Sequence, residues 1–386
     1  MTAPATAFLA ALRSVLGDAA EIPLHVPEIG AVDRRLVEEC LESTFVSSVG
    51  PFVTRFEQEI ADYTGAAHAV AVSNGTSALQ VALVLAGVRH GDLVIVPALS
   101  FVATANAVVH AGGVPYFIDS APDTLGMDPD RLSELLDGLS VDEAGARDPI
   151  SGRRVAAVVP MHTLGHPVDI ERIVALSARL GIPVVEDAAE SLGSWVGTQH
   201  TGTFGRLGIL SFNGNKIITT GGGGMILTDD VDLARHAKHL TTTAKRPHPW
   251  EFEHDEVAWN FRMPNLNAAL GVAQLSKIDD YLARKREIAR RYAEAFAGMP
   301  DFEFVGEPPG TTSNYWLCAV RVRDSSRELR DELLAAAIAD GIQCRPFWNL
   351  LNEQQMYREA PSASTPVAHE LLDAVISIPS SPGLLA

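Results

Sequence analysis

The chain has 386 residues, enough for one large domain and a smaller one, each with its own core. Apolar residues make up 47% and charged residues 20%, which is typical of a soluble globular protein. The formal net charge of −18 disfavours nucleic-acid binding, because such a surface repels a phosphate backbone. An anionic ligand therefore needs a locally prepared pocket.

The cysteine count and the N-terminal segment indicate where the protein works. Three widely spaced cysteines argue against a disulfide framework and suit a reducing cytoplasm. The apolar stretch Phe8–Leu16 is interrupted by Arg13 and has no basic leader, so we expect an amphipathic helix over residues 6–16 and no signal peptide. No run approaches the roughly 20 apolar residues of a membrane span. We expect a cytoplasmic protein without membrane contact.

Between residues 65 and 230, short β-branched runs alternate with helical stretches. The predicted strands cover residues 67–72, 93–97, 114–119, 156–160, 183–186, 209–212 and 225–228. Helices are predicted over 77–86, 103–111 and 169–180, and the polar stretch 138–154 reads as a surface insertion. Near-continuous apolar strands between amphipathic helices predict a mostly parallel sheet covered on both faces. Ligands in such sheets bind at the carboxyl ends of strands, so residues that follow a strand are the first candidates.

The pattern changes after about residue 245. Prolines at 247 and 249 interrupt the chain, and a long helical region follows over 265–296. An extended segment at 314–322, a helix at 327–340 and a strand-like segment at 341–346 come next. We therefore expect a large α/β domain over residues 1–248 and a smaller α+β domain over 249–386.

The segment Ser211–Lys216 follows a predicted strand and precedes four glycines, Gly221–Gly224. Burial disfavours the charged ammonium group of a lysine, and a neutral amine is what Schiff-base formation requires. A single loop lysine is usually an ordinary surface residue. Here the surrounding asparagines and glycines let the backbone approach a flat ligand closely, which favours a functional lysine.

A second segment, Ser73–Ser77, lies between a predicted strand and a predicted helix. Backbone N–H groups at such a junction, together with the helix dipole, form an anion site. Gly75, Thr76 and Ser77 would bind a phosphate there. The same residues also make a good turn and helix cap, so the segment alone does not decide between the two interpretations.

Two carboxylates follow the predicted strand 183–186. Asp187 can pair with the protonated pyridine nitrogen of pyridoxal phosphate (PLP), which keeps the ring able to accept electrons. Glu190 is expected beside the ring. The alternative is that Asp187 only caps the next element.

Two further residues are candidates for the same rim. Phe101, after the strand 93–97, could stack on a planar ring, although a lone phenylalanine more often belongs to a core. His162 follows the strand 156–160 and is predicted to contact the substrate. His162 and His166 have a metal-like spacing, but Gly165 and Pro167 argue against a shared helix and no third ligand is evident, so no metal site is expected.

Together these segments resemble the DegT/DnrJ/EryC1/StrS family of sugar aminotransferases over residues 22–379. The resemblance rests on Ser-Phe-x-x-x-Lys at 211–216, Asn-Gly-Thr-x-Ala-Leu at 74–79, Glu-Asp-x-Ala-Glu at 186–190 and Asn-Phe-Arg at 260–262. It implies PLP fold type I, the aspartate-aminotransferase type, with PLP held by Lys216. It also implies that Asn260 reaches the PLP phosphate of the neighbouring subunit, in a homodimer with shared active sites. Relatives usually continue into a final helix beyond residues 380–386.

One branch of the family is closer than the others. The segment Phe45–Gly50 and the run 213–224 resemble the LegC-type enzymes. This implies transfer of an amino group from glutamate to the C4 ketone of a UDP-4-keto-6-deoxy-N-acetylhexosamine, for surface-glycan or nonulosonic-acid biosynthesis. The alternative within the family is another ketosugar, carried by dTDP or GDP and aminated at C3 or C4, in antibiotic or polysaccharide biosynthesis.

Other functions fit the sequence less well. A sugar 3-dehydratase of the same family carries histidine in place of Lys216, and an amino-acid aminotransferase would show a clear carboxylate-binding arginine, which the motifs do not reveal. A Rossmann-type oxidoreductase would place G-x-G-x-x-G after the first strand, and this pattern is absent. A regulator without enzymatic activity would not need Lys216.

Overall fold

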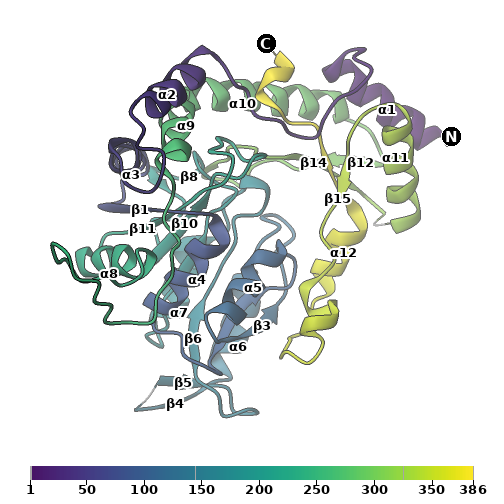
Figure 1. The fold of residues 1–386 in the computed structure, drawn as a ribbon. Coiled ribbons are helices and arrows are strands. Elements are labelled where there is room, and N and C mark those ends of the chain that lie inside the picture. Colours follow the sequence, from purple (N-terminus) through teal and green to yellow (C-terminus); the bar gives the residue numbers. More distant parts are fainter. Residues whose placement is uncertain (1, 144, 325, 386) are drawn as a thin grey trace.

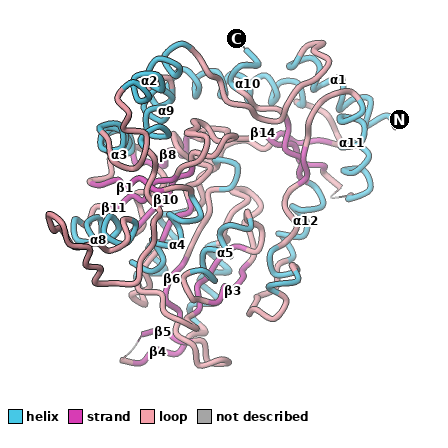
Figure 2. The backbone as a smooth tube through the Cα atoms, in the orientation of Figure 1, coloured by secondary structure: helices cyan, strands magenta, loops and turns pink. Residues whose placement is uncertain are grey.

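The computed structural model describes residues 2–143, 145–324 and 326–385. A large domain contains a central sheet with helices packed around it, and a smaller domain with its own sheet lies beside it (Figures 1 and 2). The two chain ends both lie on the side of the smaller domain (Figure 1).

The central sheet forms from two hydrogen-bonded groups of strands. One has the order β1-β11-β10-β7 and the other β3-β2-β6, and parallel bridges Val158–Val184 and Met161–Asp187 join them. The strands are β1 (His68–Val72), β2 (Leu93–Pro97), β3 (Val114–Ile118), β6 (Val155–Val158), β7 (Val185–Asp187), β10 (Leu207–Ser211) and β11 (Gly224–Thr228). Of these, only β11 runs antiparallel to its neighbours. The expected mostly parallel sheet is confirmed.

Apolar side chains on both faces of the strands explain why helices cover the sheet on two sides. Along β2, Leu93 and Ile95 pack with the residues of α6 (Pro129–Asp137) and α7 (Ile170–Ala178). Val94 and Val96 point the other way, into the core cluster that includes three other helices. These are α4 (Gly75–Leu85), α5 (Val102–His110) and α8 (Val231–Thr241).

The small domain has an antiparallel sheet with the order β12-β14-β16-β15. Its strands are β12 (Phe302–Phe304), β14 (Cys318–Val322), β15 (Arg345–Pro346) and β16 (Val375–Ile378). On one face, Cys318, Val320 and Ile376 pack under three helices. These are α1 (Ala3–Leu16), α10 (Ile278–Phe296) and α11 (Arg327–Ala339). The opposite face turns toward the large domain.

Two helices pack in a different domain from the one that the sequence predicted for them. Helix α1 was expected in the large domain, but Phe8 and Leu12 are fully buried in the small-domain core, and α1 lies beside α11 (Figure 1). Conversely, α9 (Asn265–Leu275) packs on α2 (Ala31–Glu42) and α3 (Pro51–Thr64) of the large domain. Helix α10 contributes residues to both cores. The domain boundary at residue 248 stays a prediction.

The remaining elements are short. The predicted surface insertion forms a hairpin of β4 (Ser140–Asp142) and β5 (Gly145–Arg147). The others are β8 (Trp195–Val196), β9 (Gln199–His200), β13 (Thr311–Thr312), α12 (Pro366–Ala374) and 3-10 turns at 163–165, 351–353, 355–357 and 382–385. In the part of the chain that the structure describes, no helix combines the length and apolar character needed to cross a membrane.

Candidate active site

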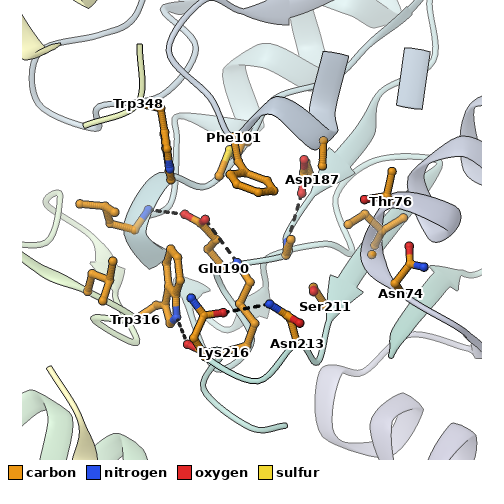
Figure 3. Close-up of a pocket in the computed structure, with 18 of the residues that line it drawn as sticks. Asn74, Thr76, Phe101, Asp187, Glu190, Ser211, Asn213, Lys216, Trp316 and Trp348 are labelled. Atoms are coloured by element: carbon orange, nitrogen blue, oxygen red, sulfur yellow. Dashed lines mark hydrogen bonds and ion pairs between the residues drawn. The ribbon is translucent and has the colours of Figure 1, made fainter. Parts of the chain in front are cut away.

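A cavity of about 380 Å³ lies at the carboxyl ends of the parallel strands and is lined by both domains (Figure 3). Seven residues predicted from the sequence line it: Gly75, Thr76, Phe101, Asp187, Glu190, Ser211 and Lys216. They come from strand ends and loops far apart in the sequence. The fold therefore brings most of the predicted site together.

Lys216 projects into this cavity from the loop after β10. Its Nζ lies 3.3 Å from Oε1 of Glu190 and 3.9 Å from the centre of the Trp316 ring. The indole Nε1 of Trp316 also donates to the carbonyl oxygen of Asn215, at 2.6 Å. Trp316 thus contacts both the lysine and its loop, which restricts where the amine can lie.

A buried lysine on α10 holds the backbone of Trp316 in place. The Nζ of Lys285, on α10, donates to the carbonyl oxygens of Trp316 (3.1 Å) and Ser380. Burial lowers the pKa of Lys285 to about 7. The small domain therefore fixes the backbone of Trp316 with a group that has no contact with solvent.

Glu190 is the buried partner of Lys216. Its Oε2 accepts the backbone N–H of Leu164 at 2.9 Å. Burial raises the pKa of this carboxyl to about 7, although the charge of Lys216 acts in the opposite direction. A carboxyl group that titrates near neutral pH beside an amine can exchange a proton with it.

Asp187 lies deeper, at the end of β7. Thr104 Oγ1 donates to Oδ2 at 2.8 Å, and the N–H of Ala189 donates to Oδ1 at 3.3 Å. Burial raises the pKa of the Asp187 carboxyl, and these hydrogen bonds only partly oppose it. A carboxylate in such surroundings is stabilised by a cationic partner, which a protonated pyridine nitrogen would supply.

The start of α4 forms the anion-binding end of the cavity. Asn74 caps the helix by accepting the N–H of Ser77 at 2.8 Å. A side chain on Gly75 would place its Cβ 2.9 Å from the Cβ of Ser211, so the glycine lets the end of β10 approach the helix. The Ser211 and Thr76 side chains line this end (Figure 3). The side chain of Ser77 is buried and does not line this end, so the contact of Ser77 with a phosphate stays a prediction.

His162 also lies outside the cavity lining, contrary to the sequence prediction. Its imidazole is fully buried, with Nε2 3.0 Å from Oε2 of Glu186. The Glu186 carboxylate in turn accepts the N–H groups of Gly202, Phe204 and Gly205. The strand before His162 ends at the rim, but the buried imidazole points away from the cavity, and the contact of His162 with a substrate stays a prediction.

Asn260 lies outside the pocket of its own chain, as the resemblance implies. It is exposed, and its Oδ1 accepts from Nε of Arg262 at 3.0 Å. The contact of Asn260 with a phosphate in a neighbouring subunit stays a prediction.

The sequence motifs missed the wall that the small domain contributes. Trp316, Leu317, Arg345, Phe347 and Trp348 all line the cavity. Phe347 and Trp348 stack at 5.8 Å, and Trp348 meets Phe101 edge-on at 6.2 Å (Figure 3). The dense Arg-Pro-Phe-Trp sequence at 345–348 was the signal that could have indicated them.

The structure also groups His239, Asp255 and Glu256 close enough to hold a metal ion, away from the pocket. Asp255 is already paired with Arg246, and Glu256 with His236. These exposed residues therefore already have positively charged or hydrogen-bonding partners.

With this geometry in place, comparison with known proteins identifies the chain. The model of the DegT/DnrJ/EryC1/StrS aminotransferase family matches residues 27–386. The chain belongs to this family. It is a sugar aminotransferase that uses PLP.

Individual relatives match over nearly their full length. The chain is 35% identical to "Putative pyridoxal phosphate-dependent aminotransferase EpsN" of Bacillus subtilis over 88% of this chain and 84% of that protein. It is 34% identical to "GDP-perosamine synthase" of Escherichia coli O157:H7, over 94% of each. The crystal structure of the aminotransferase TlmJ from Streptoalloteichus hindustanus matches with a TM-score of 0.85 and 30% identity, covering 93% of each chain.

The residues present fit PLP at three points. The Lys216 amine reaches into the cavity, and the buried Asp187 carboxylate lacks a cationic partner of its own among the described residues. Gly75 leaves the N-terminus of α4 without a side chain, where a Cβ would lie 2.9 Å from the Cβ of Ser211. These are the amine, the ring-nitrogen partner and the phosphate site that the cofactor needs.

Proposed function

We propose that this protein transfers an amino group from glutamate to the C4 ketone of a nucleotide-activated 4-keto-6-deoxy sugar, with Lys216 as the catalytic amine. One observation carries the proposal: Lys216, Asp187 and the start of α4 line a single cavity. PLP, when bound, supplies an electron sink that stabilises negative charge on the carbon bearing the amino group.

The protein residues have separate roles in this chemistry. Lys216 Nζ takes the proton from Cα of the amino donor and returns a proton at C4 of the sugar. Glu190, 3.3 Å away, accepts or supplies the proton that keeps this amine available. Asp187 would hold the proton on the ring nitrogen of bound PLP, and Gly75, Thr76 and Ser211 would bind its phosphate. Phe101 lines the cavity (Figure 3) and would stack on the ring of bound PLP.

For the sugar nucleotide we favour a UDP-4-keto-6-deoxy-N-acetylhexosamine. The resemblance of Phe45–Gly50 and of the lysine loop to the LegC-type branch supports this choice. A GDP-linked 4-keto-6-deoxy sugar is the second candidate, because the chain is similar to a GDP-perosamine synthase over 94% of its length. The aromatic wall of Phe101 and Trp348 suits the apolar face of a sugar ring in either case.

We further propose a homodimer in which Asn260 of one subunit binds the phosphate in the other. The exposed position of Asn260, outside the pocket of its own chain, supports this arrangement. The loop before it exposes Trp250 (75%) and Phe252 (78%), which are apolar enough to lie in a subunit contact.

The test is Lys216→Ala in the PLP-loaded enzyme, assayed with glutamate and a panel of UDP-, GDP- and dTDP-4-keto-6-deoxy sugars. Wild type should form an amino sugar from one member of the panel, detected by chromatography, and the variant should be slower by roughly 10²- to 10⁴-fold or more. Lys238→Ala, which removes an exposed lysine paired with Glu57, is the matched control and should keep wild-type turnover. Turnover that survives in Lys216→Ala would refute the proposed role.

A further inference from the structure

Trp316 is the aromatic residue that covers the Lys216 amine, and the proposed chemistry gives it no role. The Nζ of Lys216 lies 3.9 Å from the centre of the Trp316 ring and 3.3 Å from Oε1 of Glu190. Between these two neighbours the Lys216 side chain is only 13% exposed. Figure 3 shows the indole beside the lysine, on the side of the cavity away from Asp187. The amine therefore has a carboxyl group and an aromatic face as its near neighbours, and little contact with water.

Hydrogen bonds fix the position of Trp316 from three sides. Its Nε1 donates to the carbonyl oxygen of Asn215, in the lysine loop, at 2.6 Å. Its backbone N–H donates to Oδ1 of Asn314 at 2.7 Å, and its carbonyl oxygen accepts from Nζ of Lys285 at 3.1 Å. Asn314 Nδ2 in turn donates to the carbonyl oxygen of Glu190 at 2.8 Å, so one side chain ties together both neighbours of the amine. A ring held in this way needs no rearrangement when the charge on the amine changes.

We propose that Trp316 is a positioning residue for the proton transfer: its ring face holds the amine of Lys216 and stabilises the ammonium ion that the amine becomes. The inference rests on the proposed function, in which Lys216 takes the proton from Cα of the amino donor. In that step the Nζ lone pair forms a bond to the proton, the electron pair of the C–H bond stays with the donor carbon and the electron sink, and the neutral amine gains one positive charge. The negative face of an indole attracts this charge.

Glu190 alone does not serve this purpose. Burial raises the pKa of the Glu190 carboxyl to about 7, so this group competes with Lys216 for the proton. An aromatic face stabilises an ammonium ion but has no lone pair that takes the proton away. The stabilisation also acts where the amine needs it, because burial disfavours the charged form. Trp316 therefore helps to keep the proton on Lys216 until it is delivered to the carbon that receives it.

The first test separates the ring face from the indole N–H. PLP-loaded Trp316→Leu and Trp316→Phe are mixed with glutamate, and the change in cofactor absorbance is followed in single turnover. The limiting rate should fall roughly 2- to 30-fold in Trp316→Leu, which removes the face, and less in Trp316→Phe, which keeps an aromatic face but lacks the N–H. The apparent Kd for glutamate should stay within about threefold. The isotope effect with α-deuterated glutamate should rise in Trp316→Leu, because proton transfer then limits the rate more strongly.

Fluorinated tryptophans test the charge of the face without altering its shape. Mono-, di- and trifluorinated tryptophan, installed at position 316 alone by nonsense suppression, keep the ring and its N–H but withdraw electrons from the face. The limiting rate should fall stepwise with each added fluorine, in proteins that bind PLP as the wild type does. A role limited to the hydrogen bond with Asn215 predicts no such series, since fluorine makes the N–H a better donor.

A readout in the cofactor-free protein does not depend on turnover. Acylation of Lys216 by an N-hydroxysuccinimide ester, quantified by peptide mass spectrometry, should be faster in Trp316→Leu than in the wild type, because the ring covers the amine and favours its charged, unreactive form. Trp195→Leu is the matched control. Trp195 packs against the His200 ring at 5.0 Å and lies outside the cavity, so this variant should keep wild-type rates in every assay.

Three results would overturn the inference. The first is an unchanged limiting rate, isotope effect and acylation rate in Trp316→Leu. The second is a limiting rate that does not depend on the number of fluorines. The third is a rise in the apparent Kd for glutamate at an unchanged limiting rate, which would assign Trp316 to substrate binding. The proposed function fails separately, if glutamate does not convert the cofactor of the wild-type enzyme, whereas the acylation assay contains no cofactor.

Discussion

Glu190 is the buried carboxyl group beside the Lys216 amine. It is buried, it is 3.3 Å from the amine, and the N–H of Leu164 is directed at its other oxygen. Burial raises its pKa to about 7 from an ordinary 4.5. Between these pH values the folded protein holds a proton at Glu190 that the unfolded chain has released. Glu190 therefore stabilises the fold fully below pH 4.5, and this contribution is lost as pH rises to about 7.

Glu190→Gln should remove this pH dependence. We expect the wild type, measured without cofactor, to lose on the order of 2–3 kcal/mol more unfolding free energy between pH 5 and pH 8 than the variant does. Urea denaturation at the two pH values measures the difference. Asp187, whose pKa burial also raises, is present in both proteins, and its charge is one cause of the raised pKa of Glu190, so the difference measures Glu190 in the presence of Asp187.

The control for this measurement is Glu359→Gln, since Glu359 is exposed in a loop. It should follow the wild type at both pH values. If Glu190→Gln and wild type instead lose stability in parallel, Glu190 does not carry a raised pKa.

For single residues, the sequence predicted which side chains line the cavity where their position directly after a strand brings them there. Asp187, Glu190 and Lys216 come directly after strands, and parallel strands deliver their ends to one edge of the sheet. His162 also follows a strand, but it does not line the cavity, because the position of a strand end does not fix the direction of the side chain that follows it. Arg345 lies outside the recognised motifs, and the dense Arg-Pro-Phe-Trp sequence at 345–348 was its one signal in the sequence.

The contact between α4 and β10 is the feature that determines the anion site at the scale of elements. It depends on the absence of a side chain at Gly75, since a Cβ there would lie 2.9 Å from the Cβ of Ser211. The φ angle of Gly75 is not in the left-handed region, so space alone requires the glycine.

Gly75→Ala should therefore push the start of α4 away from Ser211. Overpacking of this kind costs about 1–3 kcal/mol of stability. We expect PLP affinity to fall about tenfold or more, because the backbone N–H groups that bind phosphate move with the helix. Absorbance titration of the cofactor-free protein with PLP measures this.

Gly214→Ala provides the comparison, because Gly214 lies in the lysine loop with nothing within 4 Å of the added Cβ. It should bind PLP as the wild type does. Equal PLP affinity in Gly75→Ala and wild type would show that this contact does not shape the site.

Elements were predictable where they are regular and local. The strands around 93–97 and 114–118 are continuous apolar runs, which predict buried parallel strands. Packing partners were not predictable in the same way. Helix α1 has an apolar stripe that would suit either domain, and only the tertiary structure shows that Phe8 and Leu12 enter the small-domain core.

At the scale of the whole molecule, the proposed dimer makes each active site depend on two chains. Lys216→Ala and Asn260→Asp should each be inactive or nearly so, the first for lack of the amine and the second because a carboxylate repels phosphate. Dissociating and reassociating an equal mixture should restore about a quarter of wild-type activity, since half the dimers are mixed and one of their two sites is intact.

The same mixture prepared without dissociation is the control, and it should stay inactive. Sedimentation must show dimers in both samples. Absence of recovery in verified mixed dimers would show that Asn260 serves the site of its own chain or none.

The two walls of the pocket come from different stretches of the chain, so substitutions can alter one wall without altering the other. The amine, the ring-nitrogen partner and the anion site come from residues 74–216, whereas the facing wall comes mainly from 316–377. Substitutions in the second stretch can alter which carbonyl compound enters without moving the groups that transfer protons. A library confined to the wall residues at 345–348 should therefore be the most direct route to enzymes with a new acceptor and an unchanged chemical step.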